Sequence, residues 1–215
     1  MRKALKNTVY LYVLLGFFWV HAGSYEDFFE AIKKDDAASV AALLARGIDP
    51  NTLGPEGLTG LFLAARSGAG KVANVLLKAP DADVECRNTV DESPLMLAAL
   101  RGDLPLARAL IARDADVNKP GWTPLHYAAS RGQLAVIDLL LEHNAYIDAE
   151  SPNGTTPLMM AAGYGSAQAT RALLQAGADA TPQNAEGMTA LDFALAFGKS
   201  ESASVLRAAA ATSQR

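Results

Sequence analysis

One stretch of the sequence decides the fold: residues 123–132 read TPLHYAASRG. The same pattern recurs in four further stretches, TGLFLAARSG (59–68), SPLMLAALRG (93–102), TPLMMAAGYG (156–165) and TALDFALAFG (189–198). The five stretches begin 34, 30, 33 and 33 residues apart, and a weaker copy, EDFFEAIKKD (26–35), lies 33 residues before the first. A unit of about 33 residues that fills most of the chain is typical of a protein built from stacked repeats.

The local chemistry of each unit predicts two helices joined by a short turn. Thr123 is a suitable N-cap, and Pro124 fits the first helical turn, where a missing N–H leaves no hydrogen bond unmade. Ala128 and Ala129 make one face of this helix thin enough for close stacking, and Gly132 permits a left-handed helix end. The second helices are expected to end at residues that tolerate positive φ, namely Gly47, Asp114, Asn144 and Gly177.

The repeated unit resembles the ankyrin repeat, because residues 123–132 are close to that family's pattern and residues 177–187 (GADATPQNAEG) are similar to its hairpin segments. The resemblance covers roughly residues 25–210. It implies an all-α ankyrin-repeat solenoid of about six helix-turn-helix units, elongated and slightly curved, with hairpin loops (fingers) that project to one side. The first and last units are charged where the others are apolar, so we expect them to act as caps. A flexible tail is expected at residues 211–215.

Residues 1–22 have the composition of a secretory signal peptide. Basic residues (Arg2, Lys3 and Lys6) precede an uncharged apolar run at 9–20, and small residues follow it. Twelve helical residues span roughly 18 Å, less than the ~30 Å hydrocarbon core of a membrane. A cleaved signal is therefore favoured over an uncleaved anchor. Export together with ankyrin-like repeats predicts a bacterial periplasmic protein; secretion from the cell and anchoring by the N-terminal segment stay open.

Composition narrows the classes of partner. The formal net charge of −4 offers no basic excess for a phosphate backbone, so nucleic acid is not expected as a partner. The single cysteine, Cys86, excludes an intramolecular disulfide and cannot build a zinc site, although a redox role stays open. We expect a monomer that has no membrane contact once the signal peptide is removed.

Catalytic motifs are incomplete in this sequence. Residues 67–71 (SGAGK) are similar to a phosphate-binding loop, but Ala65 replaces its first glycine and Val72 replaces its final Ser or Thr. His126 stands at the ankyrin position where the family resemblance implies a structural histidine that hydrogen-bonds between loops. His143 is seventeen residues away, which is no metal-ligand spacing. We therefore expect no catalytic residue, no cofactor and no metal.

The family resemblance places partner binding on the fingers and on the concave ends of the inner helices. Residues at these positions include Leu58, Arg66, Leu100, Arg101, Trp122, Ser130, Arg131, Asn153, Tyr164 and Met188. Trp, Tyr and Arg often anchor interfaces, and arginines at equivalent positions would form a ladder for an acidic partner surface. In the alternatives, the arginines pair with acids such as Glu56 and Glu92, and Trp122 packs on its own finger. Met96, Met159 and Met160 are expected to fill the core.

These features predict a non-catalytic scaffold that binds another protein and is exported to the periplasm. One alternative is a secreted effector or inhibitor module that acts on an external protein. An enzyme with an unrecognised site is the remaining alternative, and it would require a cluster of acid and base groups in a pocket.

Overall fold

The structure is a computed structural model that describes residues 23–213, so the predicted signal peptide at 1–22 lies outside the described residues. Helices are the regular elements in this part of the chain, with a single isolated β-bridge between Leu53 and Thr59, which confirms the all-α fold class. They form pairs: the helix of residues 23–33 with α2 (Ala37–Ala45), α3 (Gly60–Ser67) with α4 (Gly70–Leu76), α5 (Pro94–Arg101) with α6 (Leu104–Ile111), α7 (Pro124–Arg131) with α8 (Leu134–Glu142), α9 (Pro157–Gly163) with α10 (Ala167–Gln175), and α11 (Ala190–Ala196) with α12 (Ser200–Ser213).

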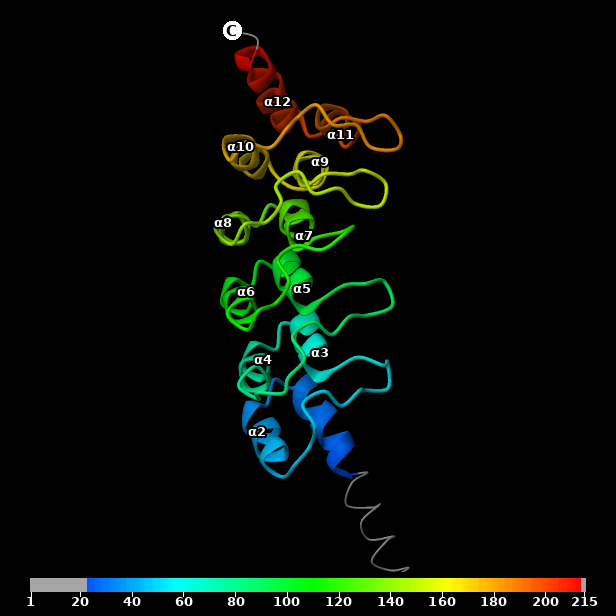
Figure 1. Cartoon of the computed structure of the whole chain (residues 1–215), viewed down its shortest axis with the longest axis vertical. Coiled ribbons are helices and arrows are strands. Elements are labelled where there is room, and N and C mark those ends of the chain that lie inside the picture. The colour runs from blue at the N-terminus through cyan, green and yellow to red at the C-terminus, as the bar shows by residue number, and fades with distance from the viewer. Residues whose placement is uncertain (1–22, 214–215) are drawn as a thin grey trace, which may run out of the picture. The chain divides into compact units, whose positions relative to one another are not determined.

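The chain divides into two compact units, with the boundary between Asp83 and Val84. In unit 1, α2 and α3 both pack against α4. In unit 2, the first helices of successive pairs form an inner row in which α5 packs on α7, α7 on α9 and α9 on α11. The second helices form an outer row in the order α6, α8, α10 and α12, and the loops before α7, α9 and α11 project to one side (Figure 1).

The inner row of unit 2 is closely packed because small side chains form the surfaces where its helices meet. Ala128 and Ala129 of α7 are completely buried, as are Ala98 and Ala99 of α5. Larger side chains such as Leu140 fill the space between the inner and outer rows. Since no single pair can bury this apolar surface alone, each pair depends on its neighbours for stability.

The predicted helix ends are confirmed. In α3, α5, α9 and α11, the N-cap hydroxyl accepts a hydrogen bond from the backbone N–H three residues later, at 3.3 Å in each helix. Gly132 ends α7 with φ +67°. The four residues expected to end the second helices also have positive φ: Gly47 (95°), Asp114 (62°), Asn144 (61°) and Gly177 (100°).

Gly165 serves a different purpose from the one that the repeat pattern predicts. It aligns with the left-handed glycines, yet α9 ends at Gly163 and Gly165 is not among the residues with positive φ. A Cβ at this position would lie 2.3 Å from the carbonyl oxygen of Ala129 in α7. Glycine is required here because two backbones approach each other closely.

The ends of the described chain differ from the middle. In the helix of residues 23–33, Phe28 and Ile32 are buried, while charged residues such as Lys33 remain exposed. Helix α12 continues to Ser213, so it includes three residues of the stretch 211–215 that was expected to be a tail. No helix within residues 23–213 is both long enough and apolar enough to cross a membrane.

Candidate functional site

An open groove of about 740 Å³ lies in unit 2 between the fingers and the ends of the inner helices; we call it the unit-2 groove. Its lining includes seven of the predicted site residues: Leu100, Trp122, Ser130, Arg131, Asn153, Tyr164 and Met188. These residues come from four successive repeats, so the regular stacking of the inner row brings them onto one surface. The groove is therefore built by the fold and does not depend on a single loop.

One end of the unit-2 groove is a cluster of three aromatic rings. The ring centroids of Tyr164 and Phe197 are 4.4 Å apart, and those of Phe193 and Phe197 are 6.0 Å apart. Tyr164 is 47% exposed and Phe197 is 45% exposed. A Cβ at Gly163 would lie 3.0 Å from the Phe197 ring and 3.1 Å from the Phe193 ring, so glycine makes room for the cluster.

At the other end, a smaller pocket of about 210 Å³ adjoins Trp122. Leu100, Trp122, His126, Tyr127, Ser130 and Met160 line it. The Trp122 ring packs edge-on against the His126 ring with a centroid distance of 5.2 Å, and Trp122 remains partly exposed. Trp122 thus lines the pocket and also packs against the helix that follows its finger.

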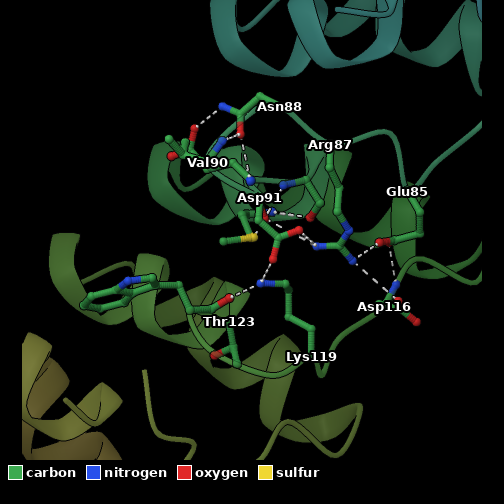
Figure 2. A network of polar contacts seen from close by, with 12 residues as sticks. Glu85, Arg87, Asn88, Val90, Asp91, Asp116, Lys119 and Thr123 are labelled. Atoms are coloured by element: carbon green, nitrogen blue, oxygen red, sulfur yellow. Dashed lines mark hydrogen bonds and ion pairs between the residues drawn. The ribbon is translucent and has the colours of Figure 1, made fainter. Parts of the chain in front are cut away.

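A network of charged side chains holds the finger that carries Trp122 (Figure 2). The Lys119 ammonium, whose side chain is 10% exposed, lies 2.5 Å from an Asp91 carboxylate oxygen and donates a 3.1 Å hydrogen bond to the Trp122 carbonyl. This ammonium holds the pKa of Asp91 below its ordinary value. Arg87 contacts the other Asp91 oxygen at 3.6 Å and also pairs with Glu85 and Asp116.

Lys119 compensates for the shortness of its finger. In two of the longer fingers, an Asn side chain closes the turn: Asn88 accepts hydrogen bonds from the N–H groups of Val90 and Glu92, and Asn184 does the same for its own loop. The finger before α7 lacks three residues, and Lys119 ties it to the preceding finger instead. The network therefore fixes where the Trp122 backbone lies.

His126 has the structural role that the family resemblance implies. Its Nε2 donates to the Thr155 carbonyl at 2.9 Å, because a carbonyl can only accept, so Nδ1 carries no proton and accepts from the Thr123 N–H at 3.1 Å. The imidazole is fully buried, and burial lowers its pKa to about 4. A neutral, fully bonded imidazole that links two fingers does not act as a general base.

The three arginines of the predicted ladder lie in different environments. Arg66 pairs with Glu56 at 2.8 Å, as the alternative interpretation expected for that residue. Arg101 is exposed at the end of α5 and is not among the groove-lining residues. Arg131 lines the unit-2 groove, and none of the ion pairs within residues 23–213 involves it. Glu92 accepts a hydrogen bond from the Tyr127 hydroxyl at 2.9 Å, which together with burial raises the pKa of Tyr127.

Leu58 is a correction to the predicted surface. It stands at a finger position in the repeat, but its side chain is only 9% exposed. The finger turns back at this point, since the Gly54 N–H donates to the Leu58 carbonyl at 2.8 Å, and the side chain packs inward. Leu58 is therefore part of the core of unit 1 and offers little to a partner.

Unit 1 has an open groove of its own, about 720 Å³ in volume, which we call the unit-1 groove. Its lining includes Tyr25, Phe29, Lys33, Glu56 and Arg66. Both cations in this lining are paired with carboxylates: Arg66 with Glu56, and Lys33 with Glu30 at 2.8 Å. These pairs hold the pKa values of Glu30 and Glu56 below their ordinary range.

Seven residues that line the unit-2 groove were not among the ten predicted site residues: Thr155, Met160, Asn184, Glu186, Phe193, Ala196 and Phe197. Phe193 precedes the inner-helix positions that the family resemblance marks. Lys119, which does not line the groove, acts through its contacts with Asp91 of the preceding finger and with the Trp122 carbonyl. Met160 was expected in the core with Met96 and Met159, but only those two are buried, and Met160 lines the groove. Helical spacing gave a signal for Met160, because it lies four residues before Tyr164 and so on the same side of the helix.

The described residues contain no group of three or more His, Cys, Asp or Glu side chains that could hold a metal ion. Cys86 is 8% exposed, so its thiol is buried. The titratable residues that line the unit-2 groove do not form an acid–base cluster, because Arg131 and Glu186 come from different repeats and are not an ion pair.

Paired helices, left-handed helix ends and projecting fingers define the chain as a helical repeat protein. A family model described as ankyrin repeats (3 copies) matches residues 61–151 and 145–214, and the chain belongs to the ankyrin-repeat family. Proteins of this family are typically non-catalytic, and ankyrin repeats generally mediate protein–protein interaction.

Several curated proteins are similar to part of this chain. An ankyrin repeat protein of Rickettsia felis is 36% identical over 134 residues, which are 59% of this chain and 58% of that protein. Ankyrin repeat and SAM domain-containing protein 6 of Rattus norvegicus is 33% identical over 98 residues, 44% of this chain and 11% of that protein. The 2-5A-dependent ribonuclease of Mus musculus is 37% identical over 68 residues, 30% of this chain and 9% of that protein. The chain thus spans less than two thirds of each of these relatives.

Proposed function

We propose that this chain is a non-catalytic scaffold that binds a partner protein through the unit-2 groove. The observation that carries the proposal is the convergence of seven predicted contact residues, from four repeats, on one open groove. Such a surface suits a partner protein because it is long, shallow and built from rigid helices, while its fingers supply polar groups along one side.

The residue types in the groove support this function. Trp122, Tyr164 and Arg131 are of the types that most often anchor protein interfaces. Large apolar side chains remain accessible at one end, where Tyr164 and Phe197 of the aromatic cluster are partly exposed. Grouped apolar surface of this kind on a folded protein commonly marks an interaction site.

Site-specific photo-crosslinking tests this proposal in the full chain. A benzoylphenylalanine in place of Phe197 is expected to form a discrete adduct with one protein in cells that produce the chain. The same photoreactive residue in place of Tyr146, which is 69% exposed and does not line the groove, is the control. Equal labelling from both positions, or no adduct from position 197, would contradict the proposal.

We further propose that the chain is exported to the periplasm. The support is in the sequence: a basic start, an uncharged apolar run at 9–20 and small residues after it. Cell fractionation followed by N-terminal sequencing tests this. A periplasmic protein that begins near residue 23 is expected, whereas a cytoplasmic protein that retains residues 1–22 would contradict export.

A further inference from the structure

We infer that the unit-2 groove binds a segment of a partner protein in which an acidic side chain lies between two apolar ones. This inference rests on the proposed function, since it specifies what the same groove recognises. It follows from three groups along the inner row: Leu100 at the end of α5, which lines the Trp122 pocket, Arg131 at the end of α7, and the aromatic cluster on α9 and α11.

The stacking of the inner helices fixes this order. Because α5 packs on α7, α7 on α9 and α9 on α11, the ends of these helices follow one another along the groove. Leu100 is near the end of α5, Arg131 is the last residue of α7, and Tyr164 caps α9. Arg131 therefore lies between Leu100, an apolar residue that lines the Trp122 pocket, and the aromatic cluster.

Each flanking subsite suits an apolar side chain. The pocket beside Trp122 has a volume of about 210 Å³, enough for one large apolar side chain. At the other end, the exposed faces of Tyr164 and Phe197 offer a surface rather than a closed pocket. An aliphatic or aromatic group that covers these rings would remove apolar area from water on both sides of the contact.

The positive charge of Arg131 favours an acidic group at the middle position. Arg131 has no ion-pair partner among the residues that the structure describes, so its guanidinium can bind a carboxylate with two parallel hydrogen bonds. The one carboxylate in the groove lining is Glu186, on the finger before α11, two repeats beyond α7. At the aromatic end, the Lys199 ammonium donates to the Gly165 carbonyl at 3.2 Å, which adds a second positive charge.

The same features favour a protein segment over nucleic acid. Arg131 is the single cation in the groove lining, and Lys199 lies beside one end of it, whereas a phosphate backbone is bound by a row of several Lys and Arg side chains. The chain as a whole is acidic, with a formal net charge of −4. A protein segment needs only one carboxylate at Arg131 and gains the rest of its affinity from the two apolar subsites.

Selection from a displayed library of random dodecapeptides on the full chain tests the inference. Enriched peptides are expected to contain Asp or Glu between two apolar residues. In fluorescence anisotropy with a synthetic copy of an enriched peptide, Arg131→Ala and Phe197→Ala should each weaken binding about 10-fold. Arg171→Ala, an exposed arginine on α10, is the matched control and should leave affinity unchanged. Circular dichroism would confirm that each variant is folded.

The outcomes separate the two proposals. Enriched peptides that lack an acidic residue, but still lose affinity with Phe197→Ala, would overturn the inferred chemistry and leave groove binding intact. Peptides that bind regardless of both substitutions, or no enriched peptide at all, would count against the groove itself.

Two other occupants would also overturn the inference. One is a second copy of the chain, seen as a dimer in light scattering that Phe197→Ala dissociates. The other is a single-stranded oligonucleotide that displaces the peptide.

Discussion

The unit-1 and unit-2 grooves are similar in volume, about 720 and 740 Å³, but differ in how their charges are balanced. In unit 1, Arg66 is bound to Glu56 and Lys33 to Glu30. In unit 2, Arg131, which is the ninth residue of its repeated stretch where Arg66 is the eighth of its own, lines the groove with no ion pair within the described part of the chain. Position at the end of an inner helix therefore predicts that a side chain reaches the groove, while neighbouring residues decide whether it is available to a partner.

A second difference lies beneath the fingers. The fourth residue of the repeated stretch is Phe62 in unit 1 and His126 in one of the four copies of unit 2, and both are buried. Phe62 is held by packing alone, whereas His126 hydrogen-bonds to two segments of backbone. The fingers before α7 and α9 are thus joined by directed polar contacts, which position the groove residues that they carry.

The largest expected effect comes from a cavity in the core of unit 2. Leu140 is completely buried, so Leu140→Ala should lower the free energy of unfolding by about 2–5 kcal/mol. Leu134→Ala, on the same helix but 40% exposed, is the control and should change little. Hydrogen exchange measured by mass spectrometry should show a larger loss of protection in unit 2 than in unit 1. This is expected because each repeat is stabilised mainly by the repeats that it contacts. Equal loss in both units would show that they unfold together.

Acid should weaken unit 2 through His126. Its folded-state pKa of about 4 lies below the ordinary 6.5, so between these values the unfolded state binds a proton that the folded state does not. Stability is therefore complete above pH 6.5 and falls as the pH drops to about 4, by up to about 3 kcal/mol. Denaturant titrations at several pH values should show this slope in the wild type and in His143→Gln, an exposed control, but not in His126→Gln. Unit 1 should show a smaller slope in this range, because Phe62 does not titrate and the exposed ion pairs of Glu30 and Glu56 weaken only toward its acid end.

A smaller effect is expected where two backbones meet. Gly165→Ala would place a Cβ 2.3 Å from the Ala129 carbonyl oxygen, so α7 and α9 would have to shift apart at a cost of about 1–3 kcal/mol. Gly70→Ala in unit 1 is the matched control, since no atom lies within 4 Å of its added Cβ and alanine favours the helix. Thermal unfolding of the two variants should show a lower midpoint for the first only. Equal midpoints would mean that the close approach at Gly165 is not required.

Most of the fold was predictable from the sequence because each repeat contains the residues that begin and end its own helices. Thr or Ser before the inner helix and a residue tolerant of positive φ after the outer one recur at regular spacing, and the structure has them at those positions. Gly165 shows the limit of this reasoning. The alignment predicts a glycine there, but the contact with Ala129 that requires it comes from the packing of α9 on α7.

The candidate site was predictable only in part. Repeat position placed Leu100, Arg131 and Tyr164 on one surface correctly. It could not show that Leu58 is buried, because the path of that finger depends on a backbone hydrogen bond within the loop. Nor could it show that Lys119 fixes the Trp122 backbone, since that contact requires a shortened finger to lie beside the preceding one.

The smallest effect on stability, and the sharpest test of the two grooves, comes from removing Arg66 and Arg131, which lie near the ends of α3 and α7, one at a time. Both side chains are exposed, and exposed charges contribute little to folding, so Arg66→Ala and Arg131→Ala should leave the thermal midpoint nearly unchanged. Binding should separate them: Arg131→Ala removes the cation that is open to a carboxylate, whereas Arg66→Ala removes one already held by Glu56. Titration of each variant with an enriched acidic peptide should therefore show weaker binding for Arg131→Ala alone. If Arg66→Ala weakens binding equally, the pairing of Arg66 with Glu56 does not keep it from a partner, and the distinction between the two grooves is wrong.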